Sequence, residues 1–225
     1  MSPRQQSLDA APLIWREGGV PVSERFDDPY FSLQGGLAET LHVFLAGNGL
    51  PGRLREGFRI AELGFGTGLN LLATARAWAG PGRISFTSFE AYPMAAGDMA
   101  RALAAFPELS GLAADLVRDW GRGLRAFALA GVDVQVIEGD AAATLPHWDR
   151  MADAWYLDGF SPAKNPDLWS DALMAAVARH TAPGGTFATY TAAGHVRRAL
   201  EAAGFAVGRR PGFGRKRHMT AGVLR

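Results

Sequence analysis

The sequence predicts an α/β fold with a mainly parallel sheet. Short apolar runs of strand length alternate with longer segments of helical periodicity, and one such run ends in a glycine-rich turn that opens a helix. Parallel strands need crossover connections, so this alternation indicates repeated strand–helix–strand units with right-handed crossovers. The last two strands have no helix between them, and we therefore expect them to pair antiparallel.

The expected elements follow one another along the whole chain. Strands are expected at residues 58–63, 84–89, 132–137, 154–157, 186–190, 205–207 and 219–224, and helices at about 69–78, within 95–120, and at 168–180 and 194–203. Upstream, residues 13–16 and 20–23 flank a Glu-Gly-Gly turn typical of a hairpin, and a helix is expected at about 36–45. We predict a Rossmann-like, seven-stranded sheet at residues 51–225, with an antiparallel last strand, and an N-terminal extension, residues 1–50, that packs on this core.

Composition limits the classes of function. The 225 residues suit one domain, and the 20% of charged residues with a net charge of +1 are ordinary for a globular protein. No apolar run approaches the roughly 20 residues that span a bilayer, and the N-terminus lacks the apolar core of a signal peptide, so we expect a cytoplasmic protein without a membrane partner. The chain has no cysteine, which excludes disulfides, thiolate metal sites and cysteine nucleophiles. The five histidines show no ligand spacing, and no metal is expected.

The segment from Glu62 to Asn70, Glu-Leu-Gly-Phe-Gly-Thr-Gly-Leu-Asn, is the strongest local motif. Glycines between a strand and a helix allow a tight turn and close approach of a ligand to the backbone. The spacing is Gly-x-Gly-x-Gly, and an acid precedes it. A pyrophosphate would be repelled by Glu62, whereas a cationic sulfonium tolerates it, so the motif favours S-adenosylmethionine over a dinucleotide. A tight turn without a ligand is the simpler alternative.

Two further acids follow the next two strands. Glu90 ends the second strand of the core and can accept hydrogen bonds from ribose hydroxyls, and Asp140 ends the third and can meet an adenine amino group. Either acid alone is more often an exposed loop residue. Ligands of open α/β sheets collect at the carboxyl edge of the strands, so acids at three successive strand ends together predict a cofactor site.

Asp158 follows the fourth strand and precedes a proline-containing loop, residues 159–166. Its alternative role is to cap the following turn. Its functional role would be to hold or deprotonate an amine, because alkylamines with a pKa of about 10.4 are mostly protonated at neutral pH. Positioning alone can supply about 7–11 kcal/mol of the barrier when reacting atoms lie roughly 3–3.5 Å apart. Methyl transfer to an amine nitrogen is therefore expected.

A basic run lies between the last two strands, and it offers phosphate contacts. Arg209, Arg210, Arg215, Lys216, Arg217 and His218 are interleaved with Phe213, an aromatic side chain able to stack on a base. Arg197 and Arg198 on the preceding helix can extend this surface. A solvated hairpin is the alternative.

Taken together, these segments resemble the methyltransferase domain of the bacterial tRNA 5-methylaminomethyl-2-thiouridine biosynthesis bifunctional proteins. The specific stretches are Asp158-Gly-Phe-Ser-Pro-Ala-Lys-Asn-Pro166 and Gly212-Phe-Gly-Arg-Lys-Arg217, and weaker matches occur at residues 28–32, 36–48, 62–70, 168–169 and 183–186. The likeness extends from about residue 12 to the end. It implies a class I methyltransferase fold, S-adenosylmethionine as cofactor, and methylation of the aminomethyl group on a tRNA wobble uridine.

The resemblance also implies roles for individual residues. Asp158 is the expected catalytic residue and faces the aminomethyl nitrogen. The expected cofactor contacts are Glu62, Gly64, Phe65, Gly66, Thr67, Gly68, Asn70, Glu90, Asp140, Asp158 and Phe160, and the expected tRNA contacts are Tyr30, Phe31, Lys164, Asn165, Phe213, Arg215, Lys216 and Arg217.

Two questions about function stay open at the level of sequence. The bifunctional members of the family continue into a flavin-dependent oxidoreductase domain that makes the aminomethyl substrate, whereas this chain stops at Arg225. It is expected to be a stand-alone enzyme supplied by a separate partner, with an excised domain as the alternative. Aminopropyl transfer to a polyamine and cofactor binding without catalysis are the other functions considered.

Overall fold

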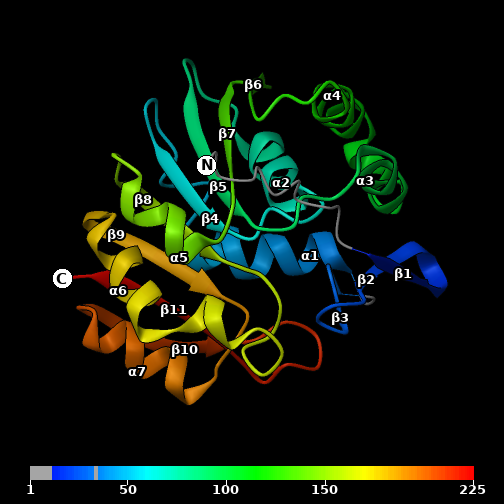
Figure 1. Cartoon of the computed structure of the whole chain (residues 1–225). Coiled ribbons are helices and arrows are strands. Elements are labelled where there is room, and N and C mark those ends of the chain that lie inside the picture. The colour runs from blue at the N-terminus through cyan, green and yellow to red at the C-terminus, as the bar shows by residue number, and fades with distance from the viewer. Residues whose placement is uncertain (1–11, 33–34) are drawn as a thin grey trace, which may run out of the picture.

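The computed structural model describes residues 12–32 and 35–225, and its centre is an eight-stranded sheet (Figure 1). The strand order is β10-β11-β9-β8-β4-β5-β7-β6, and a separate three-stranded sheet has the order β1-β2-β3. The strands are β1 Leu13–Arg16, β2 Val20–Ser23, β3 Asp28–Pro29, β4 Arg59–Leu63, β5 Ile84–Glu90, β6 Ala126–Leu129, β7 Val132–Glu138, β8 Ala152–Leu157, β9 Thr181–Thr189, β10 Phe205–Pro211 and β11 His218–Leu224. The helices are α1 Gly36–Thr40, α2 Leu69–Ala77, α3 Ala96–Leu103, α4 Ser110–Gly121, α5 Ala141–Thr144, α6 Asp171–Arg179 and α7 Gly194–Ala202.

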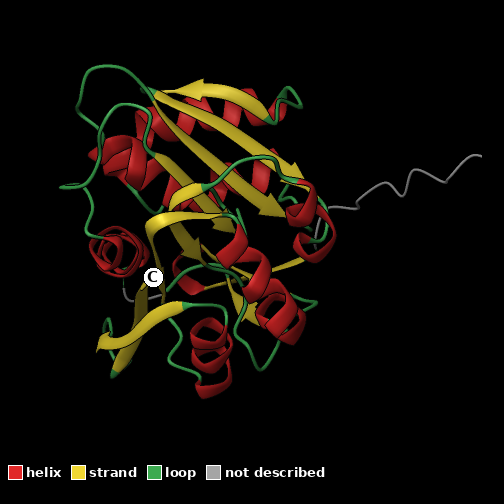
Figure 2. Cartoon of the chain, turned by 90° about the vertical axis from the view of Figure 1, so that its left-hand side faces the viewer, coloured by secondary structure: helices red, strands yellow, loops and turns green. Residues whose placement is uncertain are grey.

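Helices cover both faces of the large sheet and bury two apolar cores (Figure 2). Because successive side chains of a strand point to opposite faces, β8 supplies both cores in alternation. Tyr156 packs into the core beneath α1, α2 and α4, whereas Trp155 and Leu157 pack into the core beneath α5, α6 and α7. This three-layer arrangement explains why the central strands are apolar along their whole length, as expected for parallel strands buried on both faces.

The predicted parallel sheet and its antiparallel last strand are confirmed. Strands β4, β5, β7, β8 and β9 pair in parallel, and β11 lies antiparallel between β9 and β10. The number of strands differs from the prediction, because β6 adds an eighth strand that pairs antiparallel with β7 at the edge. Its two-residue turn, Ala130-Gly131, has φ of 43° and 81°. Asparagine or glycine usually occupies such a first position, so the alanine gave no hairpin signal.

The N-terminal segment forms the predicted hairpin and one short additional strand. Strands β1 and β2 pair antiparallel, and β3 pairs with the far side of β2. The expected helix at 36–45 is present as α1, which continues as a π-helical turn at Leu41–Leu45 and a 3-10 turn at Ala46–Asn48. Residues 1–11, in the predicted extension, lie outside the described part of the chain. Over residues 12–32 and 35–225, no helix combines the length and apolar character needed to cross a bilayer.

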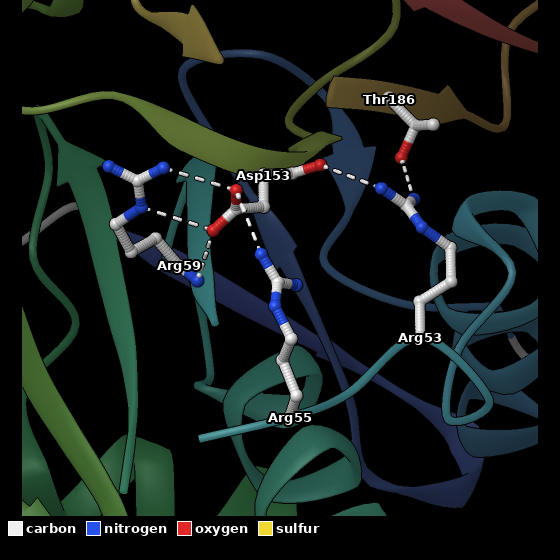
Figure 3. A network of polar contacts seen from close by, with 5 residues as sticks. All are labelled: Arg53, Arg55, Arg59, Asp153 and Thr186. Carbon is white, nitrogen blue, oxygen red and sulfur yellow. Dashed lines mark hydrogen bonds and ion pairs between the residues drawn. The ribbon is translucent and has the colours of Figure 1, made fainter. Parts of the chain in front are cut away.

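An ionic network ties the amino ends of the central strands together (Figure 3). Asp153 of β8 accepts the backbone N–H of Arg59 and two hydrogen bonds from its guanidinium, at 2.9–3.1 Å, so that β4 and β8 are joined where they begin. Burial alone would raise the pKa of Asp153, but these hydrogen bonds hold it below the ordinary value. Arg53 joins the same region to β9 through Thr186 Oγ1 at 2.6 Å. This network lies at the amino ends of the strands, so the carboxyl ends, where ligands of α/β sheets bind, are on the opposite edge.

Candidate cofactor and methyl-transfer site

The carboxyl ends of four parallel strands meet at one edge of the sheet. Leu63 of β4 pairs with Phe89 of β5 and with Leu157 of β8, and Glu90 of β5 pairs with Glu138 of β7. Backbone hydrogen bonds continue past the strand ends, from Gly64 N–H to the carbonyl of Phe89 at 2.9 Å. The predicted acids at positions 62, 90, 140 and 158 therefore belong to neighbouring strand ends on one edge of the molecule.

The glycine loop takes a conformation that other residues rarely adopt. Gly64, Gly66 and Gly68 have φ of 82°, 53° and 78°. A Cβ on Gly64 would lie 3.2 Å from Cα of Gly159, and a Cβ on Gly66 would lie 3.1 Å from Cδ1 of Tyr30. The three glycines thus provide the turn itself and the close approach of the neighbouring loops.

The side chain of Phe65, between the first two glycines, packs against α4. Its ring stacks on Trp120 of α4, with ring centroids 5.0 Å apart, and is almost completely buried. The ring of Phe65 therefore contributes to the packing between the glycine loop and α4. Thr67, the next predicted contact, is also buried.

The side chain of Glu90 binds the backbone of the glycine loop. Its Oε2 accepts the backbone N–H of Gly66 at 2.9 Å, and its Oε1 accepts the backbone N–H of Tyr92 at 2.7 Å. Burial raises the pKa of Glu90, and these backbone hydrogen bonds oppose the rise. The carboxylate is placed at the predicted strand end, and in addition it fixes the loop that would receive a cofactor.

Asn70 connects two of the predicted acids. Its Nδ2 donates to Oε1 of Glu62 at 2.9 Å and to Oδ2 of Asp158 at 2.8 Å, while its Oδ1 accepts the hydroxyl of Thr40 at 2.9 Å. The second oxygen of Glu62 accepts the hydroxyl of Ser88 at 2.7 Å. Glu62 is completely buried, and burial raises its pKa well above the ordinary value. Its carboxyl group is buried under the glycine loop and is linked to Asp158 through the side-chain amide of Asn70.

Asp158 is the acid that combines partial access with a displaced pKa. Its Oδ1 accepts the backbone N–H of Gly159 at 2.8 Å, and its Oδ2 accepts the amide of Asn70. Burial raises the pKa of Asp158 to about 7, with an additional contribution from the carboxylate of Glu39, while Lys216 and the two hydrogen bonds lower it. A carboxyl group with a pKa near neutrality can exchange a proton under physiological conditions.

The loop after Asp158 is anchored on several sides. Trp169 Nε1 donates to the carbonyl of Phe160 at 2.9 Å, and the hydroxyl of Tyr190 donates to the carbonyl of Gly159 at 2.8 Å. The backbone N–H of Ser161 donates to Asp28 at 2.7 Å, which joins the loop to the N-terminal sheet. A loop held in this way keeps Asp158 in a fixed position.

Two predicted tRNA contacts in this loop differ in their surroundings. Lys164 is already engaged, because its ammonium contacts the backbone carbonyl of Asp27 and forms an ion pair of 2.9 Å with the carboxylate. Asn165 is half-buried and precedes a 3-10 turn at Pro166–Trp169, and its backbone N–H donates to Ser161. The charge of Lys164 thus ties the loop to the N-terminal segment.

Three aromatic side chains, those of Phe26, Tyr30 and Phe160, pack together beside the glycine loop. Phe160 stacks on Phe26 with centroids 4.7 Å apart and meets Tyr30 edge-on at 5.1 Å. The hydroxyl of Tyr30 is buried and has no hydrogen-bond partner among the described residues. Burial, followed by the carboxylates of Glu90 and Asp98, raises the pKa of Tyr30. Tyr30 therefore presents a neutral hydroxyl, and an unmet capacity for hydrogen bonding, close to Glu90.

The side chains of Phe31 and Asp140 have other partners. Phe31 turns toward Phe106, with centroids 5.1 Å apart, and packs against the core. Asp140 is exposed at the end of β7, where its carboxylate accepts the backbone N–H of Ala142 at 2.9 Å and caps α5.

The basic loop between β10 and β11 divides into outward and inward side chains. Arg215 and Arg217 are exposed, whereas Phe213 packs against the core and His42. Lys216 is exposed as well, with 48% of its side chain accessible, but its ammonium turns toward the site and lies 2.8 Å from Oε1 of Glu39 and 4.3 Å from the ring centre of Tyr190. Lys216 therefore contacts the site in the structure, although the sequence suggested a phosphate contact.

Four polar residues of this network were not predicted from the sequence: Thr40, Ser88, Glu39 and Tyr190. Tyr190 directly follows β9, so its position at a strand end was a usable signal. Glu39 is an ordinary acid within α1, and only the packing of this helix brings it to the site. Among the described residues, no group of three histidine, aspartate or glutamate side chains is arranged to hold a metal ion.

A separate hollow of about 460 Å³ lies away from the strand ends described above. Its lining includes Arg53, Thr186, Arg209, Arg210 and Gly222, and none of the residues predicted for catalysis or cofactor binding. It is not part of the candidate site.

Comparison with known proteins identifies the relatives of this chain. A family model described as S-adenosyl-L-methionine-dependent methyltransferase matches residues 107–225. Proteins named tRNA 5-methylaminomethyl-2-thiouridine biosynthesis bifunctional protein MnmC are 48% identical in Caulobacter vibrioides and in Pseudomonas paraeruginosa, over 92% and 95% of this chain. The chain spans 37% and 35% of the length of these two relatives. The crystal structure of MNMC2 from Aquifex aeolicus aligns with a TM-score of 0.79 and 25% identity, over 96% of this chain and 71% of that one.

Proposed function

Because the chain belongs to the family of S-adenosyl-L-methionine-dependent methyltransferases, we propose that it methylates the primary amine of 5-aminomethyl-(2-thio)uridine at the wobble position of tRNA. The observation that carries the proposal is Asp158, a carboxyl group with a pKa of about 7 that is held by Asn70 at the end of β8. The names of the relatives point to the same tRNA nucleotide. The acceptor is therefore an amine presented to a carboxylate.

The residues around the glycine loop fit S-adenosylmethionine. A Cβ atom on Gly64 or Gly66 would crowd the residues packed against the loop, so glycine is needed at both positions. Glu90 binds the backbone of the same loop, and Tyr30 offers a buried hydroxyl without a partner among the described residues. Glu90 and Tyr30 would hold the ribose, Asp140 would reach the adenine, and Phe160 would line the pocket. Bound there, the cofactor supplies an electrophilic methyl group on a sulfonium.

Asp158 would hold the acceptor and move its proton. An alkylammonium has no free lone pair, so the nitrogen must lose a proton before it can attack. A carboxylate with a pKa of about 7 is a better proton acceptor than an ordinary aspartate with a pKa of about 3.9. Asn70 and the N–H of Gly159 fix both oxygens, which orients Asp158 toward the amine without metal or covalent chemistry.

Contacts with tRNA would come from the outward side chains of the basic loop. Arg215 and Arg217 are exposed and free to meet phosphates, and Tyr30 and Phe213 offer aromatic rings near the site edge. Lys164, Asn165 and Phe31 would contribute through the loops that they hold. The aminomethyl substrate would be made by a separate activity, such as a flavin-dependent oxidoreductase, and such a reaction would take place in the cytoplasm.

The test is methyl transfer from labelled S-adenosylmethionine to tRNA isolated from cells that lack the final methylation. We expect label in a single nucleoside that co-migrates with the methylaminomethyl product. tRNA from cells that have completed the modification is the control and should accept no label. Label transferred to a polyamine when decarboxylated cofactor is supplied would support aminopropyl transfer instead. Cofactor binding without any transfer would indicate a non-catalytic role.

A further inference from the structure

The ammonium of Lys216 lies close enough to Asp158 to lower the pKa of its carboxyl group. The ammonium of Lys216 forms an ion pair of 2.8 Å with Glu39, whose side chain is only 13% exposed, and lies 4.3 Å from the ring centre of Tyr190. A carboxylate and the face of an aromatic ring are the two groups with which proteins recognise alkylammonium ions. We call these two side chains, Glu39 and Tyr190, the ammonium seat.

The ammonium seat is connected to Asp158 on both sides. Glu39 precedes Thr40, whose hydroxyl donates to the same Asn70 that donates to Asp158. Tyr190 donates to the carbonyl of Gly159, the residue that follows Asp158. The charges also interact, because Glu39 raises the pKa of Asp158 and Lys216 lowers it. The ammonium seat and Asp158 thus belong to one network of hydrogen bonds and charges, to which Lys216 contributes a positive charge.

We propose that Glu39 and Tyr190 bind the ammonium of the acceptor, and that Lys216 occupies this seat until the acceptor displaces it. The inference rests on the proposed function, since it assigns the residues that recognise the acceptor amine at the same site. The chemistry supports an exchange, because both cations are primary ammonium groups, carried by a four-carbon side chain in Lys216 and by a single methylene in the aminomethyl acceptor. Glu39 has an ammonium partner in either state, so its carboxylate is never left without a counter-charge.

The position of Lys216 in the chain favours its displacement by tRNA over its displacement by a free amine. Lys216 lies between Arg215 and Arg217, which are exposed on the loop that would meet tRNA phosphates. An ammonium released from Glu39 would add a third cation to this loop. Phosphate contacts would then favour the release of Lys216 from the ammonium seat. The seat would become accessible when tRNA binds, and it would stay occupied by Lys216 in the presence of free amines. Lys216 would therefore act as a specificity residue.

The first experiment measures occupancy without any methyl transfer. Thermal unfolding of the Lys216→Ala protein is followed in increasing propylammonium chloride, with sodium chloride of equal ionic strength as the control. We expect a saturable rise in Tm for Lys216→Ala and none for the wild type, whose seat is filled. The double variant Glu39→Gln, Lys216→Ala should show no rise. An equal rise in the single and double variants, or no rise in either, would overturn the seat; Lys216→Met provides the same test if the alanine variant does not fold.

The second experiment measures specificity. The acceptors are an anticodon stem-loop carrying 5-aminomethyluridine and the free nucleoside, which has no flanking phosphates. In Lys216→Ala we expect kcat/KM for the nucleoside to rise about fivefold or more, because neither the ion pair nor the cation–π contact must be broken. Arg179→Ala, an exposed arginine at the end of α6, is the matched control and should leave both acceptors unchanged.

The two proposals fail in different ways. A wild-type protein that methylates neither acceptor contradicts the proposed function, whereas the propylammonium experiment can still show or exclude the seat. A wild-type protein that methylates the stem-loop, together with an unchanged or lower nucleoside kcat/KM in Lys216→Ala, refutes the role of Lys216 alone. Glu39→Gln should raise KM for the stem-loop about tenfold without changing the affinity for S-adenosylmethionine, as expected for loss of a charged hydrogen bond. An unchanged KM would exclude Glu39 from acceptor binding.

Discussion

Nδ2 of Asn70 donates a hydrogen bond of 2.8 Å to Oδ2 of Asp158 and a second hydrogen bond of 2.9 Å to Oε1 of the buried Glu62. The first helix after the glycine loop therefore positions the carboxyl group at the end of β8. This connection makes the glycine loop and Asp158, the proposed catalytic residue, parts of one network, and the predictions below test its members one at a time.

Asp158→Ala should abolish most turnover and preserve cofactor binding. General acid–base groups contribute about 10²- to 10⁴-fold to rates, so we expect a loss of kcat in that range. Calorimetry should give a dissociation constant for S-adenosylmethionine within about threefold of the wild type, a difference of less than 1 kcal/mol. Asp149→Ala, at an exposed acid outside the site, serves as the control. Normal turnover of Asp158→Ala would remove Asp158 from the mechanism.

The carboxyl group of Asp158 should titrate near pH 7 in the free protein. Carbon NMR of labelled aspartate side chains should show one resonance with a midpoint of about 7, absent in Asp158→Ala. The folded pKa is raised above the unfolded value of about 3.9, so the stability that this group contributes is fully present below about pH 4 and is lost as the pH rises toward 7. A midpoint near 4 would show that burial does not act on this group as described.

Glu62→Gln should be tolerated, whereas Glu62→Ala should not. The glutamine oxygen can accept the amide of Asn70, and its amide can donate to Oγ of Ser88 once the Ser88 hydroxyl, which donates to Glu62 in the structure, has turned its own hydrogen away, so both contacts are kept with one of them reversed. Because burial raises the pKa of Glu62, the glutamine variant should gain in Tm relative to the wild type as the pH rises from 5 to 8. Alanine leaves two buried groups without partners and should cost about 1–3 kcal/mol for each. A loss of cofactor affinity in the folded glutamine variant would instead show that the charge itself contacts the ligand.

Glu90→Gln should weaken cofactor binding more than Glu62→Gln does. Both oxygens of Glu90 accept backbone N–H groups, from Gly66 and Tyr92, and the amide of a glutamine would place a donor against one of these donors. We expect the affinity for S-adenosylmethionine to fall at least tenfold, which corresponds to the loss of one or two charged hydrogen bonds. Calorimetry measures the dissociation constant, and an unaltered value would count against Glu90 in the cofactor site.

Charge reversal at Arg215 and Arg217 should weaken tRNA binding without affecting the cofactor. Each lost phosphate contact lowers the slope of log K against log salt by roughly 0.7–0.9, so the double variant should flatten it by about 1.5. Filter binding at several salt concentrations gives both the affinity and the slope. Arg179→Glu, which changes the net charge by two units against four in the double variant, is the control for a charge reversal outside the loop. An unchanged slope would exclude this loop from phosphate contact.

Much of the fold could be predicted because it is encoded locally. Strand length, helical periodicity and the glycine turn predicted seven of the eight strands of the large sheet and its antiparallel last strand. Strand β6 was missed because its turn uses Ala130 at a positive φ, where the sequence has no asparagine or glycine to mark it. The residues at the strand ends were predicted for a related reason, since the carboxyl ends of parallel strands necessarily share one edge.

The sequence by itself determined the parallel sheet, the glycine loop and the placement of Glu62, Glu90, Asp140 and Asp158 at neighbouring strand ends. Only the tertiary structure decided which of these acids lies beneath the loop and which faces the site, because burial depends on packing from helices that are distant in sequence. It also decided the direction of Lys216. The charge of Lys216 suggested a phosphate contact, but Glu39 and Tyr190, from two other elements, provide a carboxylate and an aromatic face to which an ammonium turns.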